Sequence, residues 1–310
     1  MPLHPLLGQS QMSHVAEVQR ARAGMLFAAP ALLLIGVFFF VPIGAAFLLS
    51  LTDYDIYAIA DLDRLRFVGA ANYAALLDEA LFWTALRNTA VFVVVAGPLS
   101  IAASLVAALL VTATAVRLAG LFRTLFFLPV VTSLVAVAVV WRYLYHPRFG
   151  LLNYALGLVG VAPRDWLGDP HWALAAIILM SVWKGFGFNM VIFMAGLQSI
   201  PAQLYEAAAV DGAGRRTQFV RVTLPMLRPT LLFVVAMTLI GNFQLFAEPY
   251  VMTRGGPSNA TLSVVLYMYE QGFRWWNLGF AAAIAFALFG IIVLVTLLTR
   301  GLARGAGNAA

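Results

Sequence analysis

The chain has 310 residues, of which 63% are apolar and only 10% are charged; because soluble domains carry about 25% charged residues, this composition excludes an ordinary soluble protein. The formal net charge of +6 comes almost entirely from arginine, and in so hydrophobic a chain this excess indicates cytoplasmic loops of a membrane protein, not nucleic-acid binding. The absence of cysteine excludes disulfides and thiolate metal sites, and the four histidines show no paired metal-ligand spacing.

Long uncharged stretches predict the membrane spans, because a transmembrane helix takes about 20 apolar residues. The gaps between charged residues place six such spans near 24–51, 88–113, 122–144, 172–197, 229–250 and 278–300. The first is too long for the core of a signal peptide and is expected to be retained. We therefore predict an all-α polytopic membrane protein with six transmembrane helices, preceded by a segment 1–23 and followed by a tail 301–310.

The distribution of arginines predicts the orientation of these spans. With the N-terminus inside, the inner segments hold ten arginines and three acidic residues, whereas the outer segments hold seven arginines and ten acidic residues. Because arginine-rich loops stay on the cytoplasmic side, both termini and the loop 201–228 are predicted to be cytoplasmic. The segment 52–86 is then external, and its sequence ANYAALLDEALFWTAL predicts an amphipathic helix at the outer membrane surface.

Polar side chains at membrane depth are candidates for a solute pathway. Lys184 lies near the middle of the fourth predicted span, and Asn242, Phe243 and Gln244 lie toward the outer half of the fifth. Amides, charges and aromatic faces bind hydroxyl-rich solutes, so these four residues are candidates to line the pathway. Hydrogen bonding between helices is the alternative, and it remains open. Glu248 is expected to lie too near the outer surface to pair with Lys184.

The loop PAQLYEAAAVDGAGRRTQFVRVTLPMLRP lies between the fourth and fifth predicted spans. Pro201 suits the first turn of a short helix whose three consecutive alanines leave it thin enough to enter a groove on another protein. Gly212 and Gly214 can adopt the left-handed backbone that ends a helix. A second amphipathic helix is expected to end at Leu224 and Pro225. The loop could contact a partner protein, or it could be an ordinary loop whose arginines meet anionic lipid.

Short motifs within this loop follow one another in a fixed order. Glu-Ala-Ala is followed by Asp-Gly-Ala and later by Leu-Pro, and together they resemble the EAA loop of binding-protein-dependent ABC importer permeases. The sequence from 242 to 273, with TRGGP where the family has Thr-Gly-Gly-Gly-Pro, is similar to carbohydrate-uptake permeases of the maltose and glycerol-phosphate type. The resemblance covers roughly residues 24–300. The motif residues in this chain are Glu206, Ala207, Ala208, Asp211, Gly212, Ala213, Leu224 and Pro225.

The resemblance implies a type I ABC importer permease fold and a transport subunit of the bacterial inner membrane, not an enzyme. In such importers two permease subunits, here implied to be a heterodimer, form one pathway. An extracytoplasmic solute-binding protein delivers an oligosaccharide, polyol or glycerol phosphate. Two ATP-binding subunits use ATP and Mg at the cytoplasmic face, and the EAA motif residues would couple them to the helix bundle. This chain has no Gly-Lys-Ser/Thr phosphate loop, so we expect it to bind no nucleotide cofactor itself.

An ion-coupled secondary transporter of small polar solutes is the main alternative. Such transporters often carry carboxylates inside the membrane, and no Asp or Glu lies centrally in a predicted span of this chain. An intramembrane hydrolase would need a metal cluster, paired acids or a Ser/His site, and no His lies centrally in a span either. Neither alternative explains the motifs of the cytoplasmic loop, so the sequence favours the permease.

Overall fold

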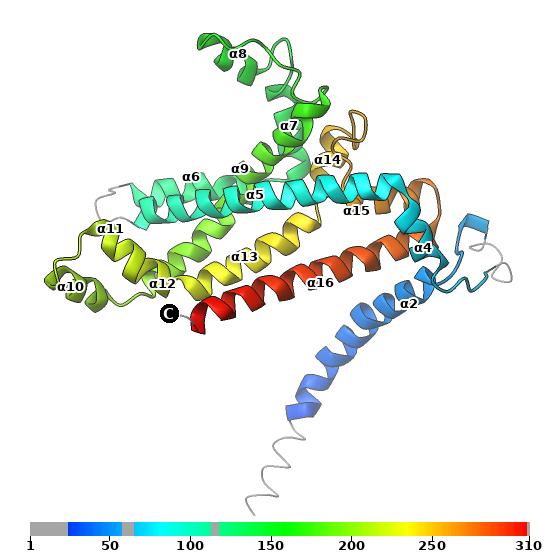
Figure 1. The fold of residues 1–310 in the computed structure, drawn as a ribbon, viewed down its shortest axis with the longest axis horizontal. Coiled ribbons are helices and arrows are strands. Elements are labelled where there is room, and N and C mark those ends of the chain that lie inside the picture. The colour runs from blue at the N-terminus through cyan, green and yellow to red at the C-terminus, as the bar shows by residue number, and fades with distance from the viewer. Residues whose placement is uncertain (1–23, 58–64, 113–117, 309–310) are drawn as a thin grey trace, which may run out of the picture.

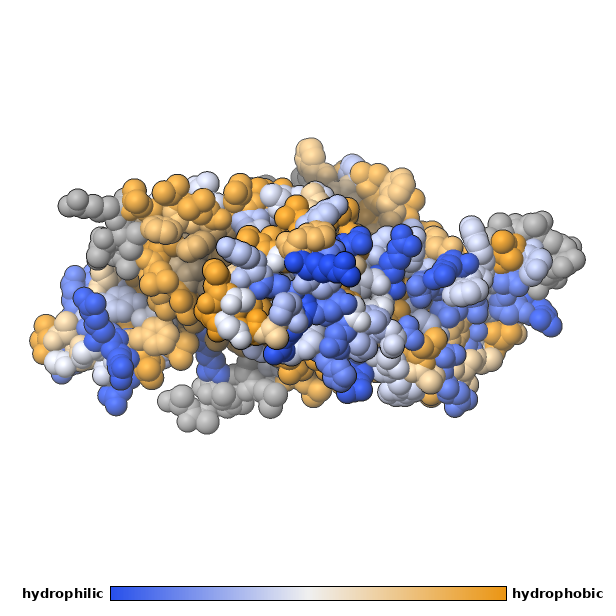
Figure 2. Space-filling model, turned by 90° about the horizontal axis from the view of Figure 1, so that it is seen from above, coloured by the Kyte–Doolittle hydropathy of each residue, from blue (hydrophilic) through white to orange (hydrophobic). Residues whose placement is uncertain are grey.

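The protein is an elongated helical bundle (Figure 1). The computed structural model describes residues 24–57, 65–112 and 118–308, and within these ranges no residue belongs to a named strand, although Thr52 and Phe67 form an isolated antiparallel bridge. The all-α fold class is therefore confirmed. Figure 2 shows that hydrophobic and hydrophilic residues are mixed on the face seen from above, with strongly hydrophilic residues at the end where α10 and α11 lie, in the middle and toward the opposite end.

The helices follow one another along the chain, some joined by a few residues and others by longer loops. After a first span, Gly24–Ser50, which includes η1 (Gly36–Phe40) and α2 (Val41–Ser50), they are α4 (Ala71–Asp78), α5 (Ala80–Thr112), α6 (Ala119–Val131), α7 (Leu134–Leu144), α8 (Leu151–Leu158), α9 (Pro170–Gln198), α10 (Ala202–Val210), α11 (Arg215–Gln218), η3 (Phe219–Thr223), α12 (Leu224–Met226), α13 (Arg228–Phe243), α14 (Ala247–Met252), α15 (Val264–Tyr269), η4 (Glu270–Arg274) and α16 (Leu278–Asn308).

Each predicted span has a helical counterpart among the described residues. Five helices there are long and apolar enough to cross a membrane, and a sixth span is present if the bent pair α6 and α7 is counted as one. The five are Gly24–Ser50, Ala80–Thr112, Pro170–Gln198, Arg228–Met252 and Leu278–Thr299.

The second span begins at Ala80, well before the predicted start at residue 88. The predicted surface helix is divided at Glu79, whose backbone is extended, so that its first half forms α4 and its second half continues into α5. Arg87 is the charged residue that precedes the long uncharged stretch, but it lies on an exposed face of the 33-residue helix and does not end it. At 1.5 Å per residue this helix is about 50 Å long and extends beyond the hydrocarbon core.

The third span is broken, whereas the sequence predicts one continuous helix over 122–144. α6 ends at Val131, α7 begins at Leu134, and their axes differ by 99°. Pro129 lacks the N–H that a helix interior needs, and Thr132 has an extended backbone and donates its hydroxyl to the Pro129 carbonyl at 2.6 Å. A count of uncharged residues cannot detect such a break, because every residue in the region remains uncharged.

The centre of the bundle is the pair α5 and α9, which pack along each other, with α6 beside α9 and α13 between α5 and α16. Close backbone approach makes this packing possible. A Cβ added to Gly187 of α9 would lie 2.1 Å from the Phe126 carbonyl oxygen of α6. Ser104 of α5 donates its hydroxyl to the Phe186 carbonyl of α9 at 2.8 Å.

The first span lies apart from the rest of the bundle, as Figure 1 shows. Its C-terminal end alone is held: Phe47 packs edge-to-face on Phe286 of α16, and the Ser50 hydroxyl lies 2.8 Å from the Tyr73 hydroxyl of α4. The remaining apolar side chains of this helix are largely exposed within the single chain.

Candidate functional site

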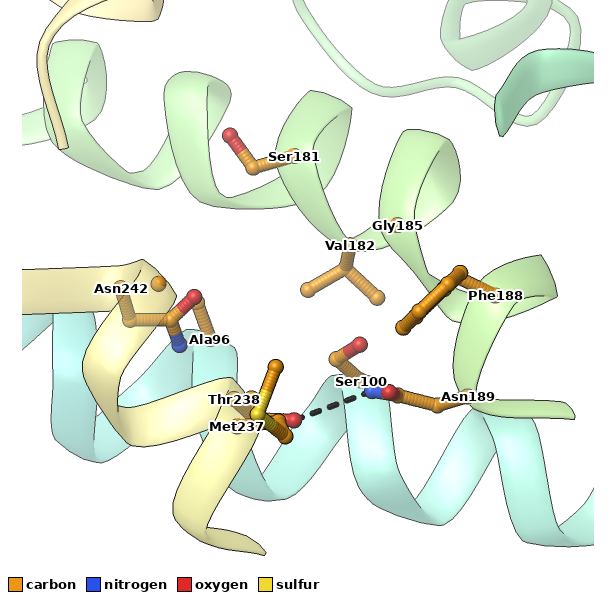
Figure 3. Close-up of a pocket in the computed structure, with 11 residues that line it drawn as sticks. Ala96, Ser100, Ser181, Val182, Gly185, Phe188, Asn189, Met237, Thr238 and Asn242 are labelled. Carbon is orange, nitrogen blue, oxygen red and sulfur yellow. Dashed lines mark hydrogen bonds between the residues drawn. The ribbon is translucent and has the colours of Figure 1, made fainter. Parts of the chain in front are cut away.

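A cavity lined by both polar and apolar side chains lies between α5, α9 and α13 (Figure 3). Its volume is about 230 Å³. We call it the Asn189 cavity, because Asn189 of α9 donates its amide to the Thr238 hydroxyl of α13 across it at 3.0 Å. Its other lining residues are Ala96, Ser100, Ser181, Val182, Gly185, Phe188, Met237, Gly241 and Asn242.

A second cavity, of about 550 Å³, adjoins the first and shares Asn242, Ser181 and two glycines with it. We call it the Glu248 cavity. It is bordered by both charged residues of this region, Lys184 and Glu248, and by the amide of Gln244. The two cavities together form a polar region inside the membrane-spanning part of the chain, where polar groups are otherwise costly and mark solute pathways.

Lys184 is satisfied by backbone carbonyls. Its Nζ donates to the carbonyl oxygens of Pro129 at 3.2 Å and Val130 at 3.5 Å, both in the last turn of α6. Inter-helix hydrogen bonding, one of the two alternatives open for this residue, is therefore present in the structure. Lys184 also borders the Glu248 cavity.

Glu248 lies nearer to Lys184 than the sequence indicates, because both side chains border the same cavity, but no ion pair joins them among the described residues. That expectation assumed a straight fifth span. In the structure α13 ends at Phe243 and α14 begins at Ala247, and α14 packs against α7 and α9. The interruption returns Glu248 toward the interior of the bundle.

Two buried polar atoms at these cavities have no hydrogen-bond partner among the described residues: the Asn242 Nδ2 and the Ser181 Oγ. Buried polar atoms are nearly always hydrogen-bonded, so each such exception calls for an explanation. Both residues border both cavities. Donors left open beside a polar cavity are available to a hydroxyl-rich ligand or to water.

Phe243 lies apart from the other three predicted pathway residues. It is only 6% exposed and belongs to an apolar cluster with Val93, Leu262 and Ile284. Asn242 and Gln244, its neighbours in sequence, border the cavities instead. Successive residues of a helix point about 100° apart, so an aromatic between two cavity residues does not itself have to face the cavity. This placement favours a packing role for Phe243.

Several cavity residues were missed by the sequence reasoning. Asn189 was not among the pathway candidates; it follows Lys184 by five residues and therefore lies on another face of α9. It borders the neighbouring cavity. Ser100 and Thr238 have small polar side chains within apolar runs, and only their position beside Asn189 in the folded chain distinguishes them from helix hydroxyls that bond their own backbone.

The first half of the loop 201–228 forms α10, and its motif creates a defined helix end. The N–H of Ala213 bonds the Ala208 carbonyl at 2.8 Å, and the N–H of Gly212 bonds the Ala209 carbonyl at 3.0 Å. This pattern is a Schellman C-cap, which needs a left-handed residue, and Gly212 has φ +77°. Gly214 has an extended backbone instead, so only one of the two glycines adopts the expected conformation.

Most of the motif side chains on α10 face solvent. Glu206, Ala207, Asp211 and Gly212 are exposed, and Val210 is 87% exposed. The helix is tied to the following segment, where the Tyr205 hydroxyl lies 3.0 Å from the Thr223 hydroxyl. α10 to α12 lie at the same end of the bundle as the C-terminus (Figure 1).

The second half of the loop is helical from Arg215 to Met226, through α11, η3 and α12. The expectation that Leu224 and Pro225 end this helix is therefore wrong. Pro225 occupies the first turn of α12, where a missing N–H is tolerated. The chain turns two residues later, at Leu227, whose side chain is buried.

Residues 96–307, which contain the loop 201–228, the Asn189 cavity and all residues of the Glu248 cavity except Phe92, match the family of binding-protein-dependent transport system inner membrane components. The chain belongs to this family. Membership of this family explains why the chain has a permease fold with membrane-spanning helices. It also explains why the loop resembles the EAA motif.

Proteins related to this permease align with it over nearly its whole length. It is 37% identical to the lactose transport system permease protein LacF of Rhizobium radiobacter, over 91% of this chain and 94% of that protein. It is 31% identical to the arabinooligosaccharides transport system permease protein AraP of Bacillus subtilis, over 96% and 94%. Its fold matches a bacterial alginate ABC transporter in complex with an alginate pentasaccharide-bound periplasmic protein, with a TM-score of 0.78, 20% identity and coverage of 94% and 97%.

Proposed function

We propose that this permease is the membrane subunit of an ATP-driven ABC importer for a sugar or sugar-like solute. Transport permeases for lactose and for arabinooligosaccharides are among its relatives. The observation that carries the proposal is the exposed, Schellman-capped α10, located at the end of a bundle whose interior holds a polar cavity. None of the relatives named above is an ion-coupled transporter, so the secondary-transporter alternative gains no support.

The exposed face of α10 is the proposed contact with the ATPase. Its alanines keep the helix thin, and Glu206 and Asp211 place carboxylates where basic groups of an ATPase groove could pair with them. Gly212 fixes the end of the helix and hence the direction in which the chain leaves it. ATP and Mg would be used by the partner subunits, since this chain has no phosphate-binding loop.

The proposed assembly contains two permease chains, two ATP-binding subunits and an extracytoplasmic binding protein. The alginate transporter of similar fold is itself seen with a loaded periplasmic protein. α10 and the C-terminus share one end of the bundle, so the orientation that puts the loop 201–228 in the cytoplasm also puts the C-terminus there. The arginine distribution supports this orientation for both termini, in a bacterial inner membrane.

The proposed solute contacts are the amides and hydroxyls of the two cavities. Asn242, Gln244 and Asn189 offer donors and acceptors without a formal charge. Lys184 and Glu248 contribute one charge of each sign. This set suits an uncharged, hydroxyl-rich solute better than an acidic one, because no net charge is offered.

Purification of the permease with the subunits encoded beside it tests the proposal. The ATPase activity of the complex in nanodiscs is measured with the binding protein and a panel of neutral oligosaccharides, polyols and glycerol phosphate. The proposal expects ATP hydrolysis to rise with at least one neutral member of the panel. A complex that contains no ATPase, or one driven only by an ion gradient, would contradict it.

A further inference from the structure

The chain has a single lysine, and it lies beside the break in the third span. Lys184 is on α9, yet both of its hydrogen bonds go to the last turn of α6, at Pro129 and Val130. No hydrogen bond from this ammonium to an amide or carboxylate of the cavities is present in the described part of the chain. A physical explanation is therefore needed for why the Lys184 ammonium bonds the end of α6, and not only for why a charged residue lies inside the membrane.

The two carbonyls that Lys184 binds lie at the break, where the helical N–H partners are lost. In a continuous α-helix the Pro129 carbonyl would accept from the N–H of residue 133, and the Val130 carbonyl from that of residue 134. Those residues are Ser133 and Leu134, where the chain turns into α7. The last four carbonyls of any helix lack intrahelical partners, and in the membrane such groups must be satisfied from within the protein. The Thr132 hydroxyl donates to the Pro129 carbonyl, and Lys184 donates to both carbonyls from another helix.

Electrostatics favour the same arrangement. The C-terminal end of a helix carries partial negative charge, and a cation near the last turn is stabilising there. In a low-dielectric interior this interaction is less screened than at a surface. One side chain thus satisfies two carbonyls and places a positive charge where the α6 dipole is negative. Glu248 borders the same cavity as Lys184.

The break forms part of the cavity wall. Val130 of α6 and Leu134 of α7 both border the Glu248 cavity. α7 also packs against α14, which carries Glu248. A change in the angle between α6 and α7 therefore alters the shape of this cavity directly.

We propose that Lys184 is a positioning residue that closes the broken end of α6 and so holds the bent third span as a wall of the pathway. In this role its ammonium does not bind the solute. Solute recognition is left to the uncharged amides and hydroxyls. The inference concerns the geometry of this chain, so it stands or falls independently of the solute proposed above.

A distance measurement across the bend tests the inference. The chain has no native cysteine, so Leu121→Cys in α6 and Tyr143→Cys in α7, both exposed, can carry paired spin labels in the assembled, nucleotide-free importer. Lys184→Met removes the donors and the charge at similar length, and Lys184→Arg retains both. We expect the Met variant to shift or broaden the distance distribution and the Arg variant to restore it.

Uptake kinetics provide a second readout that separates positioning from binding. If Lys184 positions the wall, Lys184→Met lowers the maximal uptake rate about tenfold while KM changes less than about twofold. A solute ligand would show the reverse pattern with an unchanged distance distribution. If the Met variant does not assemble, Lys184→Gln, which keeps one amide donor, is measured in the same way and a smaller shift is expected.

Two outcomes overturn the inference. The first is a Met or Gln variant whose distances match those of the unsubstituted chain, whatever happens to uptake. The second is an equal shift in the Met and Arg variants, since that would show that any change of side-chain shape at this position disturbs the bend without a role for the donated hydrogen bonds.

Discussion

Gly212 shows how one residue sets the end of the proposed coupling helix. The Schellman bonds from Gly212 and Ala213 exist only if the chain turns through the left-handed region, where φ is +77°. A Cβ at this position would meet no other atom within 4 Å. The requirement for glycine therefore comes from the backbone conformation, and the space around it is left free for a partner.

Gly212→Asp is expected to leave the permease folded and inserted but to uncouple uptake from ATP hydrolysis. A side chain in the left-handed region costs about 1–2 kcal/mol, and the carboxylate would occupy the space proposed for the ATPase. Gly214→Asp is the matched control, because Gly214 has an extended backbone and also has no atom within 4 Å of an added Cβ. Uptake and ATPase rates are measured in proteoliposomes. Normal coupled uptake by the Gly212 variant would contradict the assignment.

Asn242 is the residue through which the two cavities meet, and its Nδ2 has no partner among the described residues. We predict that Asn242→Leu, of similar size, raises the KM for uptake roughly five- to tenfold, since one hydrogen bond is worth about 1 kcal/mol. Phe243→Leu is the comparison, because Phe243 packs in the apolar cluster. It should lower thermal stability and leave KM unchanged. A KM effect at Phe243 and none at Asn242 would reverse the two assignments.

At the scale of elements, α9 holds the bundle together through close backbone contacts. Gly187 lets α6 and α9 approach until an added Cβ would lie 2.1 Å from the Phe126 oxygen. That oxygen belongs to the backbone and cannot move away alone, so even a methyl group must separate the helices.

Gly187→Ala should therefore destabilise the permease, by roughly 1–3 kcal/mol as for other overpacked interiors. Gly290→Ala on α16 is the control, because no atom lies within 4 Å of the added methyl group. Both are helical glycines, so the gain in helix propensity is shared. The melting temperature in detergent is the measurement. Equal stability of the two variants would mean that the α6–α9 contact is looser than the structure indicates.

Local chemistry made many of these elements predictable from the sequence. Apolar length predicts the spans, and Asp-Gly-Ala predicts the end of α10, because both depend on neighbouring residues only. The hydrogen bonds that Lys184 donates at the break between α6 and α7 come from a residue 52 positions beyond Thr132 in the chain. The return of Glu248 to the cavity depends on how α14 packs. Neither could be derived from local pattern, and the same holds for the packing position of Phe243.

At the scale of the whole molecule, the loop 201–228 and the cavities are joined by two helices. α9 enters the loop and carries Asn189, while α13 leaves it and carries Asn242. α9 has 29 residues and is about 43 Å long at 1.5 Å per residue. Because long helices are stiff, we expect a tilt applied at α10 to reach the cavity walls along α9 and α13, through the short turns that join these helices to the loop.

The central claim is that a separate ATPase holds α10, and site-directed cross-linking tests it most directly. Ala207→Cys, exposed on α10, carries a short photoreactive group in the assembled importer, and Leu77→Cys, exposed on α4 at the opposite end of the bundle, is the control. The account predicts an adduct of Ala207→Cys with an ATP-hydrolysing subunit and none from Leu77→Cys. The absence of that adduct, or equal adducts from both positions, would contradict it.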